Sequence, residues 1–201
     1  TAGWNHLLYS LTAGLDEGKG ENYVDIFFLG QKGGSGAMEG TDGYDHIGMI
    51  DASGGVLTQD YEMFEQQTPH VLNQHEYIVD SAGSGQWRGG IGTETEYTIG
   101  SDDTQFVTFG DGDFIPAFGL FGGGDANLNT IELTFPDGEK KVPNNKDLWT
   151  GVPKGTRYYQ VAGGGGGYGD PKKRDREKLA AEVRDGLISE DAARDVYGLE
   201  G

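Results

Sequence analysis

The sequence contains no cysteine and no long apolar run. The absence of cysteine from its 201 residues excludes a disulfide framework, a thiolate nucleophile and a zinc–thiolate site. No apolar stretch approaches the roughly 18 residues of a membrane-spanning helix. The first residues lack the basic and apolar regions of a signal peptide, so we expect a cytoplasmic protein. Because the chain begins with Thr1 rather than Met, we also expect a processed or cleaved product.

Basic residues are scarce as well. Lysine and arginine number 15 against 33 aspartate and glutamate residues, which gives a formal net charge of −18. Such a chain repels nucleic acid and anionic membrane surfaces, so neither is expected as a partner. Two interpretations of the acidity stay open: it keeps the protein soluble, or it is an adaptation to a high-salt cytoplasm.

Glycine, in contrast, is abundant. The 37 glycines occur in short clusters without a G-X-Y period, which excludes a collagen-like chain. Ten tyrosines, nine phenylalanines and three tryptophans argue against disorder. This combination predicts packed strands joined by tight turns, in a chain long enough for one domain with its own core.

The hydrophobic patterns predict an α+β fold that is predominantly β. Apolar residues at helical spacing predict a short N-terminal helix over residues 4–15. Residues 23–30, rich in aromatic and branched side chains, predict a buried strand. Residues 93–99 alternate in a way that predicts a strand with one buried face and one solvated, acidic face. The later strands are expected within residues 75–80, 92–100, 104–110, 130–138 and 156–164.

The sequence changes in character near its C-terminal end. An apolar stripe that ends at Gly186 predicts one helix, and Ser189 is the expected N-cap of a second. We therefore divide the chain into a glycine-rich antiparallel β domain, residues 1–170, and a helical tail, residues 171–201.

Residues 40–55 form a glycine-rich loop that carries Asp42, Asp45, His46 and Asp51. These side chains suit a divalent cation, but their spacing matches no known ligand pattern. No metal is therefore expected in this chain, with Asp42, His46 and Asp51 as weak candidates. His46, with Asp45, is the main catalytic candidate, as a proton carrier or as a group that orients substrate or bicarbonate. The alternative is that His46 only closes the loop by hydrogen bonding.

Arg88 is the third catalytic candidate, because it is an isolated cation in a neutral, glycine-rich turn. It could clamp a carboxylate or bicarbonate. The alternative is that it caps backbone carbonyls of the turn or stacks on Trp87. His75 and Glu76 are neighbours on an expected strand, so they should point to opposite faces and cannot both serve one site unless a bulge intervenes. A hydrogen-bonded structural role is expected for His75.

Residues 163–169 invite comparison with a phosphate-binding loop. Such a loop exposes backbone N–H groups at a helix start and usually includes a lysine at fixed spacing. Here Asp170 and Pro171 follow the glycines, and an acidic residue opposes an anion. We predict close packing and positive φ angles for this run, not nucleotide binding.

Three stretches, taken in order, carry a family resemblance. They are QWRGGIG (86–92), GGGGGYGDP (163–171) and EVRDGLISEDAARDVYGL (182–199). Their sequence and spacing resemble the C-terminal third of hydantoinase B/oxoprolinase proteins. The resemblance covers most of the chain and is best after Asp80.

Within that family, residues 42–70 look most like the large subunits of acetone and acetophenone carboxylases. Amide-hydrolysing members have a threonine-rich stretch here that this sequence lacks. The resemblance therefore favours a fragment or split subunit of an ATP-dependent, biotin-independent ketone carboxylase that joins bicarbonate to a ketone. One alternative is an ATP-dependent cyclic-amide hydrolase of the hydantoinase, 5-oxoprolinase or lactamase type. Another is a non-catalytic structural part of such a complex.

The resemblance also implies partners and cofactors. The partners are a hydantoinase A-type ATP-binding subunit, the remaining part of the hydantoinase B-type subunit, and a small-molecule ketone or cyclic amide. ATP and a divalent metal would be bound by other chains of this hetero-oligomer. No lysine stands in the setting that accepts biotin, so biotin is not expected.

Overall fold

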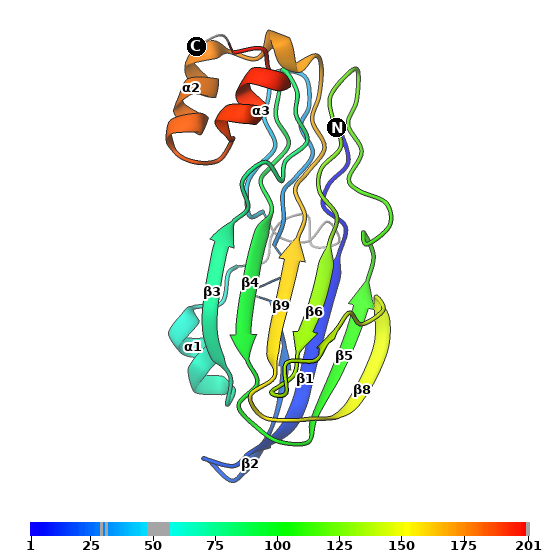
Figure 1. Cartoon of the computed structure of the whole chain (residues 1–201), viewed down its shortest axis with the longest axis vertical. Helices are drawn as coiled ribbons and strands as arrows, with labels where there is room; N and C mark the ends of the chain where they lie inside the picture. Colours follow the sequence, from blue (N-terminus) through cyan, green and yellow to red (C-terminus); the bar gives the residue numbers. More distant parts are fainter. Residues whose placement is uncertain (29, 31, 48–56, 200–201) are drawn as a thin grey trace.

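Two antiparallel sheets pack against each other in the computed structural model, which describes residues 1–28, 30, 32–47 and 57–199 (Figure 1). The first sheet has the order β2 (Glu21–Ile26), β1 (Leu8–Asp16), β5 (Thr104–Gly110) and β8 (Lys146–Val152). The second has the order β3 (Val71–Tyr77), β4 (Thr93–Thr98), β9 (Arg157–Ala162), β6 (Thr130–Thr134) and β7 (Lys140–Lys141). The predominantly β character expected from the sequence is confirmed.

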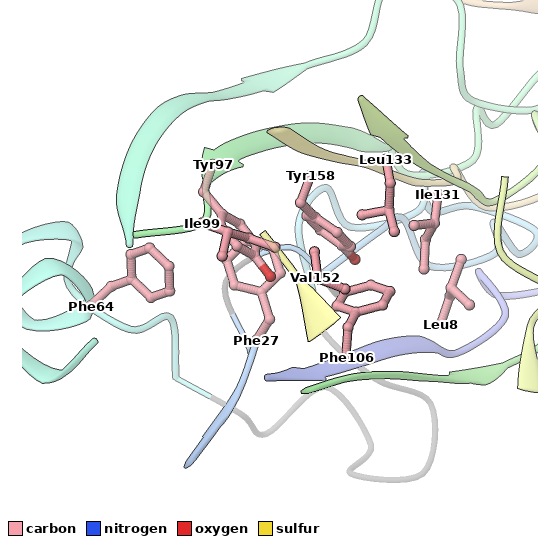
Figure 2. Close-up of a cluster of buried hydrophobic side chains, with 10 residues drawn as sticks. All are labelled: Leu8, Phe27, Phe64, Tyr97, Ile99, Phe106, Ile131, Leu133, Val152 and Tyr158. Carbon is pink, nitrogen blue, oxygen red and sulfur yellow. The ribbon is translucent and has the colours of Figure 1, made fainter. Parts of the chain in front are cut away.

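The main core lies between the two sheets, and both contribute side chains to it (Figure 2). Its centre is aromatic: the rings of Tyr97 and Tyr158 stack with their centroids 4.7 Å apart, and Phe27 lies 4.7 Å from Tyr97. In β4 the predicted alternation is confirmed, because Thr93, Thr95 and Tyr97 are buried while the glutamates between them are partly exposed. The core consists of Leu8, Phe27, Phe64, Tyr97, Ile99, Phe106, Ile131, Leu133, Val152 and Tyr158.

The N-terminal helix predicted for residues 4–15 is wrong, because this segment contains strand β1. The strand pairs with β2 on one edge and β5 on the other, so its backbone is satisfied by partners far along the chain. Leu8 is 1% exposed but Leu15 is 48% exposed, so the apolar residues do not form one buried stripe. Tertiary pairing outweighs the helical spacing here.

Strand β2 also differs from expectation. It ends at Ile26 and lies at the edge of its sheet, with Val24 71% exposed, so the buried strand predicted for residues 23–30 is wrong in its burial. The core residue of this segment is Phe27, which follows the strand and is 1% exposed. Helix α1 (Tyr61–Gln67) was not expected from the sequence. Asp60 caps it, and Phe64 joins the core.

Extended segments, most of them rich in glycine, lie side by side between the sheets and the C-terminal helices (Figure 1). We call them the glycine bundle: residues 1–5, 33–37, 81–90, 117–124 and 163–168. They hydrogen-bond to one another through their backbones. The amide nitrogens of the last segment donate to the carbonyl oxygens of Gly90, Gly3 and Gly124 at 2.8, 2.8 and 3.0 Å.

The bundle explains the glycines of residues 163–169. A Cβ atom on Gly165 would lie 1.9 Å from the carbonyl oxygen of Ser35, and one on Gly166 would lie 1.9 Å from that of Phe118. The predicted close packing is therefore confirmed. The predicted positive φ is found only at Gly169, where φ is 75°. The other glycines of the run serve the close approach of neighbouring backbones.

The tail contains the short 3-10 turn η2 (Pro171–Lys173), α2 (Arg176–Arg184) and α3 (Glu190–Asp195). As predicted, Ser189 caps α3, with its hydroxyl accepting from the Ala192 amide at 3.1 Å. Gly186 follows α2 with φ of 75°. A small separate core holds the two helices together: Leu179, Ile188, Ala193 and Tyr197. Among the helices of the described residues, none has the length and apolar character that a membrane span requires.

Candidate functional site

The candidate residues Asp42, Asp45 and His46 lie on one short segment beside the glycine bundle. The two carboxylates hold the backbone of the next bundle segment. Asp42 accepts a hydrogen bond from the Arg88 amide at 2.8 Å, and Asp45 accepts one from the Ile91 amide at 2.7 Å. The sequence-predicted residues Asp45 and Arg88 are thus brought together, across 43 positions of the chain.

Arg88 and Arg174 form the centre of a buried ion-pair network. The Arg88 guanidinium donates to Asp45 at 2.9 Å, to Glu182 at 2.8 Å and to the Gly89 carbonyl at 2.6 Å. Arg174 donates to Asp42 at 2.9 and 3.1 Å, and to both oxygens of Glu182 at 2.8 and 3.0 Å. The side chains of the two arginines are only 7% and 1% exposed.

The charges in this network are mutually stabilised. Burial opposes the charge of Arg88, but hydrogen bonds and charges from Asp45 and Glu182 raise its pKa above its ordinary value. Burial likewise opposes the charge of Asp42, yet Arg174 lowers the pKa of this carboxyl below its ordinary value. Because Glu182 belongs to α2, the network fastens the tail to the β domain. This arrangement favours a positioning role for Asp45 and Arg88, including the predicted capping of a turn carbonyl.

His46 lies in a different environment from the two carboxylates, because it lines a pocket. The pocket has a volume of about 140 Å³ and is lined by His46, Tyr61, His75, Glu76, Tyr77 and Thr93. The His46 and His75 ring centroids lie 5.1 Å apart, and the planes of the rings are inclined by 64°. The Nε2 atoms of both rings are buried and have no hydrogen-bond partner among the described residues.

Three elements position this pocket. His46 has a left-handed backbone with φ of 48°, which turns the chain where the loop leaves the glycine bundle. His75 comes from the edge strand β3, where it pairs with Thr95 of β4. Tyr61 opens α1, and its hydroxyl lies 3.1 Å from His75 Nδ1. His75 thus has the hydrogen bond expected for a structural histidine, while its second nitrogen stays available.

Both histidines of the pocket are held neutral. Burial, the neighbouring His75 ring and the charge of Lys32 lower the pKa of His46 to about 4. Burial and Lys32 also lower the pKa of His75. At neutral pH the two rings therefore offer uncharged hydrogen-bonding groups. This favours orientation of a substrate group by His46 over proton transfer near pH 7.

The other histidines do not join the pocket. His70 is 2% exposed in the core, with Nε2 3.0 Å from the Thr12 hydroxyl and Nδ1 accepting from the Gly100 amide at 3.3 Å. Burial lowers the pKa of His70 to about 3. His6 lies at the start of β1, away from the loop.

The metal candidates Asp42 and His46 lie in different surroundings. Within the described ranges, no group of three or more histidine, aspartate or glutamate residues has the geometry to hold a metal ion. Asp42 is engaged by Arg174, and His46 faces the pocket rather than Asp42. Asp51 lies outside the described residues.

Several residues of these sites could not be predicted from local sequence patterns. Arg174 and Glu182 lie in the tail, 86 and 94 positions after Arg88 in the chain, and no local spacing connects them. Tyr61 belongs to a helix that the pattern did not reveal. His75 was noticed, but its pairing with His46 depends on how the loop folds onto β3.

Comparisons with known proteins agree with the fold. Caprolactamase subunit beta of Pseudomonas jessenii is 33% identical over 99% of this chain and 35% of its own length. The acetone carboxylase alpha subunit of Xanthobacter autotrophicus is 26% identical over 83% of this chain and 26% of its own length. The crystal structure of the ATP-dependent caprolactamase from Pseudomonas jessenii matches with a TM-score of 0.82 and 29% identity, over 98% of this chain and 36% of that one.

The chain therefore spans between about a quarter and about a third of the length of these relatives. A family profile described as Hydantoinase B/oxoprolinase matches residues 1–171. The three stretches that carry the resemblance in the sequence lie in the glycine bundle and the tail, where the structure gives them packing roles. This chain belongs to the hydantoinase B/oxoprolinase family.

Proposed function

We propose that the chain forms part of the large subunit of an ATP-dependent enzyme that hydrolyses small cyclic amides. The observation that carries this proposal is its 33% identity, over 99% of the chain, to a caprolactamase subunit whose structure has the same fold. The neutral histidine pocket supports it, because uncharged imidazoles suit an uncharged amide better than an anion.

The proposed enzyme is a complex of several chains. A hydantoinase A-type subunit would bind ATP, and the rest of the hydantoinase B-type subunit would hold a divalent metal. An apolar loop supports contact with another protein surface. Phe114, Ile115 and Phe121 are 87, 69 and 76% exposed, although large apolar side chains are normally buried.

A ketone carboxylase is the second candidate. It is favoured by the loop of residues 42–70, which resembles the corresponding part of acetone and acetophenone carboxylases, and by the similarity to an acetone carboxylase subunit. A purely structural role of this chain in either complex is the third candidate. It is favoured by the ion-pair network, because Asp45 and Arg88 form ion pairs within the chain rather than facing a ligand.

Substrate-dependent ATP hydrolysis by the assembled complex tests these candidates. We expect phosphate release to rise when ε-caprolactam or hydantoin is added. A rise that requires acetone together with bicarbonate, without a response to either cyclic amide, would establish the carboxylase instead. To test the structural role, His46→Gln and Asp45→Asn complexes are compared with wild type. Unchanged kcat and KM in both would assign this chain a scaffold function.

A further inference from the structure

Two unpartnered nitrogens in one pocket are the observation from which this inference starts. Buried polar atoms normally have a hydrogen-bond partner, and leaving one unpaired is costly. Among the described residues, the Nε2 atoms of His46 and His75 have no hydrogen-bond partner, and the centroids of the two rings are 5.1 Å apart. His46 and His75 both line a pocket of about 140 Å³. A ligand that binds both nitrogens would remove the cost.

The hydrogen bond from Tyr61 sets the polarity of one ring. When the Tyr61 hydroxyl donates to His75 Nδ1, across 3.1 Å, the single proton of the neutral His75 ring must lie on Nε2. His75 then presents an N–H donor to the pocket. If His46 Nε2 also carried a proton, two N–H donors would face the same small pocket from rings 5.1 Å apart. The complementary tautomer of His46 has its proton on Nδ1, so that Nε2 is an acceptor.

Lys32 and the lack of a third ligand among the described residues disfavour a metal cation in the pocket, although Glu76 also lines it. Lys32 is 4% exposed, donates to the Thr58 hydroxyl at 2.8 Å, and disfavours positive charge on both histidines. Two imidazoles without a third ligand also form a weak metal site, and the described residues supply no third one. A neutral ligand with both a donor and an acceptor satisfies the pocket best.

A cyclic amide has this combination on one edge. Ring closure holds the amide in the cis form, so its C=O and its N–H point to the same side. We propose that His75 and His46 bind the two groups of a small cyclic amide, with His75 Nε2–H donating to the carbonyl oxygen and His46 Nε2 accepting from the amide N–H. Tyr61 is then a positioning residue that fixes the tautomer of His75. The choice of substrate rests on the proposed function, but the binding geometry is tested separately.

The experiment is equilibrium binding to the assembled complex without ATP, measured by titration calorimetry. Three seven-membered rings serve as probes: ε-caprolactam, N-methyl-ε-caprolactam, in which a methyl group replaces the N–H proton, and cycloheptanone, in which a CH2 group replaces the N–H. We expect ε-caprolactam to bind about 3- to 10-fold tighter than either analogue, as for the loss of one neutral hydrogen bond.

The variants separate the roles of the three residues. His46→Phe should abolish the preference for ε-caprolactam over its N-methyl analogue. His75→Phe and Tyr61→Phe should weaken the binding of both lactams about 3- to 10-fold. They should also reduce the red shift of the carbonyl infrared stretch of bound [13C]caprolactam, which a purely structural role would not change. His6→Gln and Tyr44→Phe, outside the pocket, are the matched controls.

Equal affinities for the three probes would overturn the proposal, as would wild-type binding and an unchanged carbonyl stretch in the His75 and Tyr61 variants. Zn²⁺ binding that requires both histidines, without lactam binding, would also overturn it. ATP hydrolysis is measured on the same samples. Lactam binding as described without lactam-dependent turnover refutes the proposed function alone. Lactam turnover without this binding pattern refutes the present inference alone.

Discussion

Replacing Glu182 by glutamine should loosen the attachment of the C-terminal tail. This carboxylate accepts hydrogen bonds from both buried arginines of the ion-pair network, Arg88 at 2.8 Å and Arg174 at 2.8 and 3.0 Å. Glutamine has nearly the same shape, but it is neutral and has only one acceptor oxygen. The change therefore leaves two guanidinium groups, 7% and 1% exposed, with less compensating charge.

The expected loss of stability is about 3 kcal/mol. Breaking a buried ion pair by removing one partner costs about 3–5 kcal/mol. The lower end applies because each arginine keeps a second carboxylate, Asp45 for Arg88 and Asp42 for Arg174. For a domain of this size, such a loss lowers Tm by about 6–12 °C.

Thermal unfolding followed by circular dichroism gives Tm, and limited proteolysis reports whether the tail detaches first. Glu177→Gln is the matched control, since Glu177 lies in the same helix but is exposed. We expect it to change the free energy of unfolding by no more than about 0.5 kcal/mol. If Glu182→Gln changed stability as little as Glu177→Gln, the network could not be what fastens the tail.

Three further predictions concern stability and assembly. Gly165→Ala should destabilise the chain by about 3 kcal/mol, because its Cβ atom would lie 1.9 Å from the Ser35 carbonyl oxygen. The control is Gly18→Ala, whose Cβ atom would meet only the Asp16 side chain, at 3.3 Å. It should cost much less stability in the same thermal unfolding experiment. If nucleotide affinity of the complex changed with Gly165→Ala at unchanged stability, the packing role would be refuted. In the folded chain the pKa values of His46 and His70 are about 4 and 3, well below the unfolded value near 6.5. As pH drops from 7 to 5, the unfolded chain therefore takes up more protons than the folded chain, and stability should fall. The pKa of Asp25, raised by burial to about 6, offsets part of this loss, and urea titrations at both pH values measure the net change. Finally, the isolated chain should aggregate or show no ATP turnover, and an active monomer in a sedimentation and ATPase assay would contradict this.

The sequence predicted the elements whose burial or capping can be recognised from neighbouring residues alone. Strand β4 alternates because one face covers the core and the other faces solvent, and the tail helices have clear caps. Strand β1 was mistaken for a helix because its partners lie at residues 21–26 and 104–110, which local spacing cannot reveal. Strand β8, with its charged and polar residues, lies at the edge of its sheet and gave no apolar signal.

The candidate site was predictable only for residues within one loop. Asp42, Asp45 and His46 were found because they are close in sequence, but their separation into an ion-pair network and a histidine pocket depends on tertiary contacts. Arg88 was singled out as an isolated cation in a glycine-rich turn, but its partner Glu182 lies in the tail, where no local pattern points to it. The direction in which His46 faces follows from its left-handed backbone, which its sequence neighbours do not specify.

The glycine bundle constrains the order in which this chain can fold. Its five segments come from residues 1–5 to residues 163–168, and each is hydrogen-bonded to others far away in the chain. Closure of such distant contacts is slow, and glycine loses more backbone freedom on ordering than any other residue. During synthesis, residues 1–5 cannot form their hydrogen bonds to residues 163–168 until the latter have left the ribosome. Until then its glycine-rich segments lack their partners, so we expect this chain to be prone to aggregation while it is being synthesised.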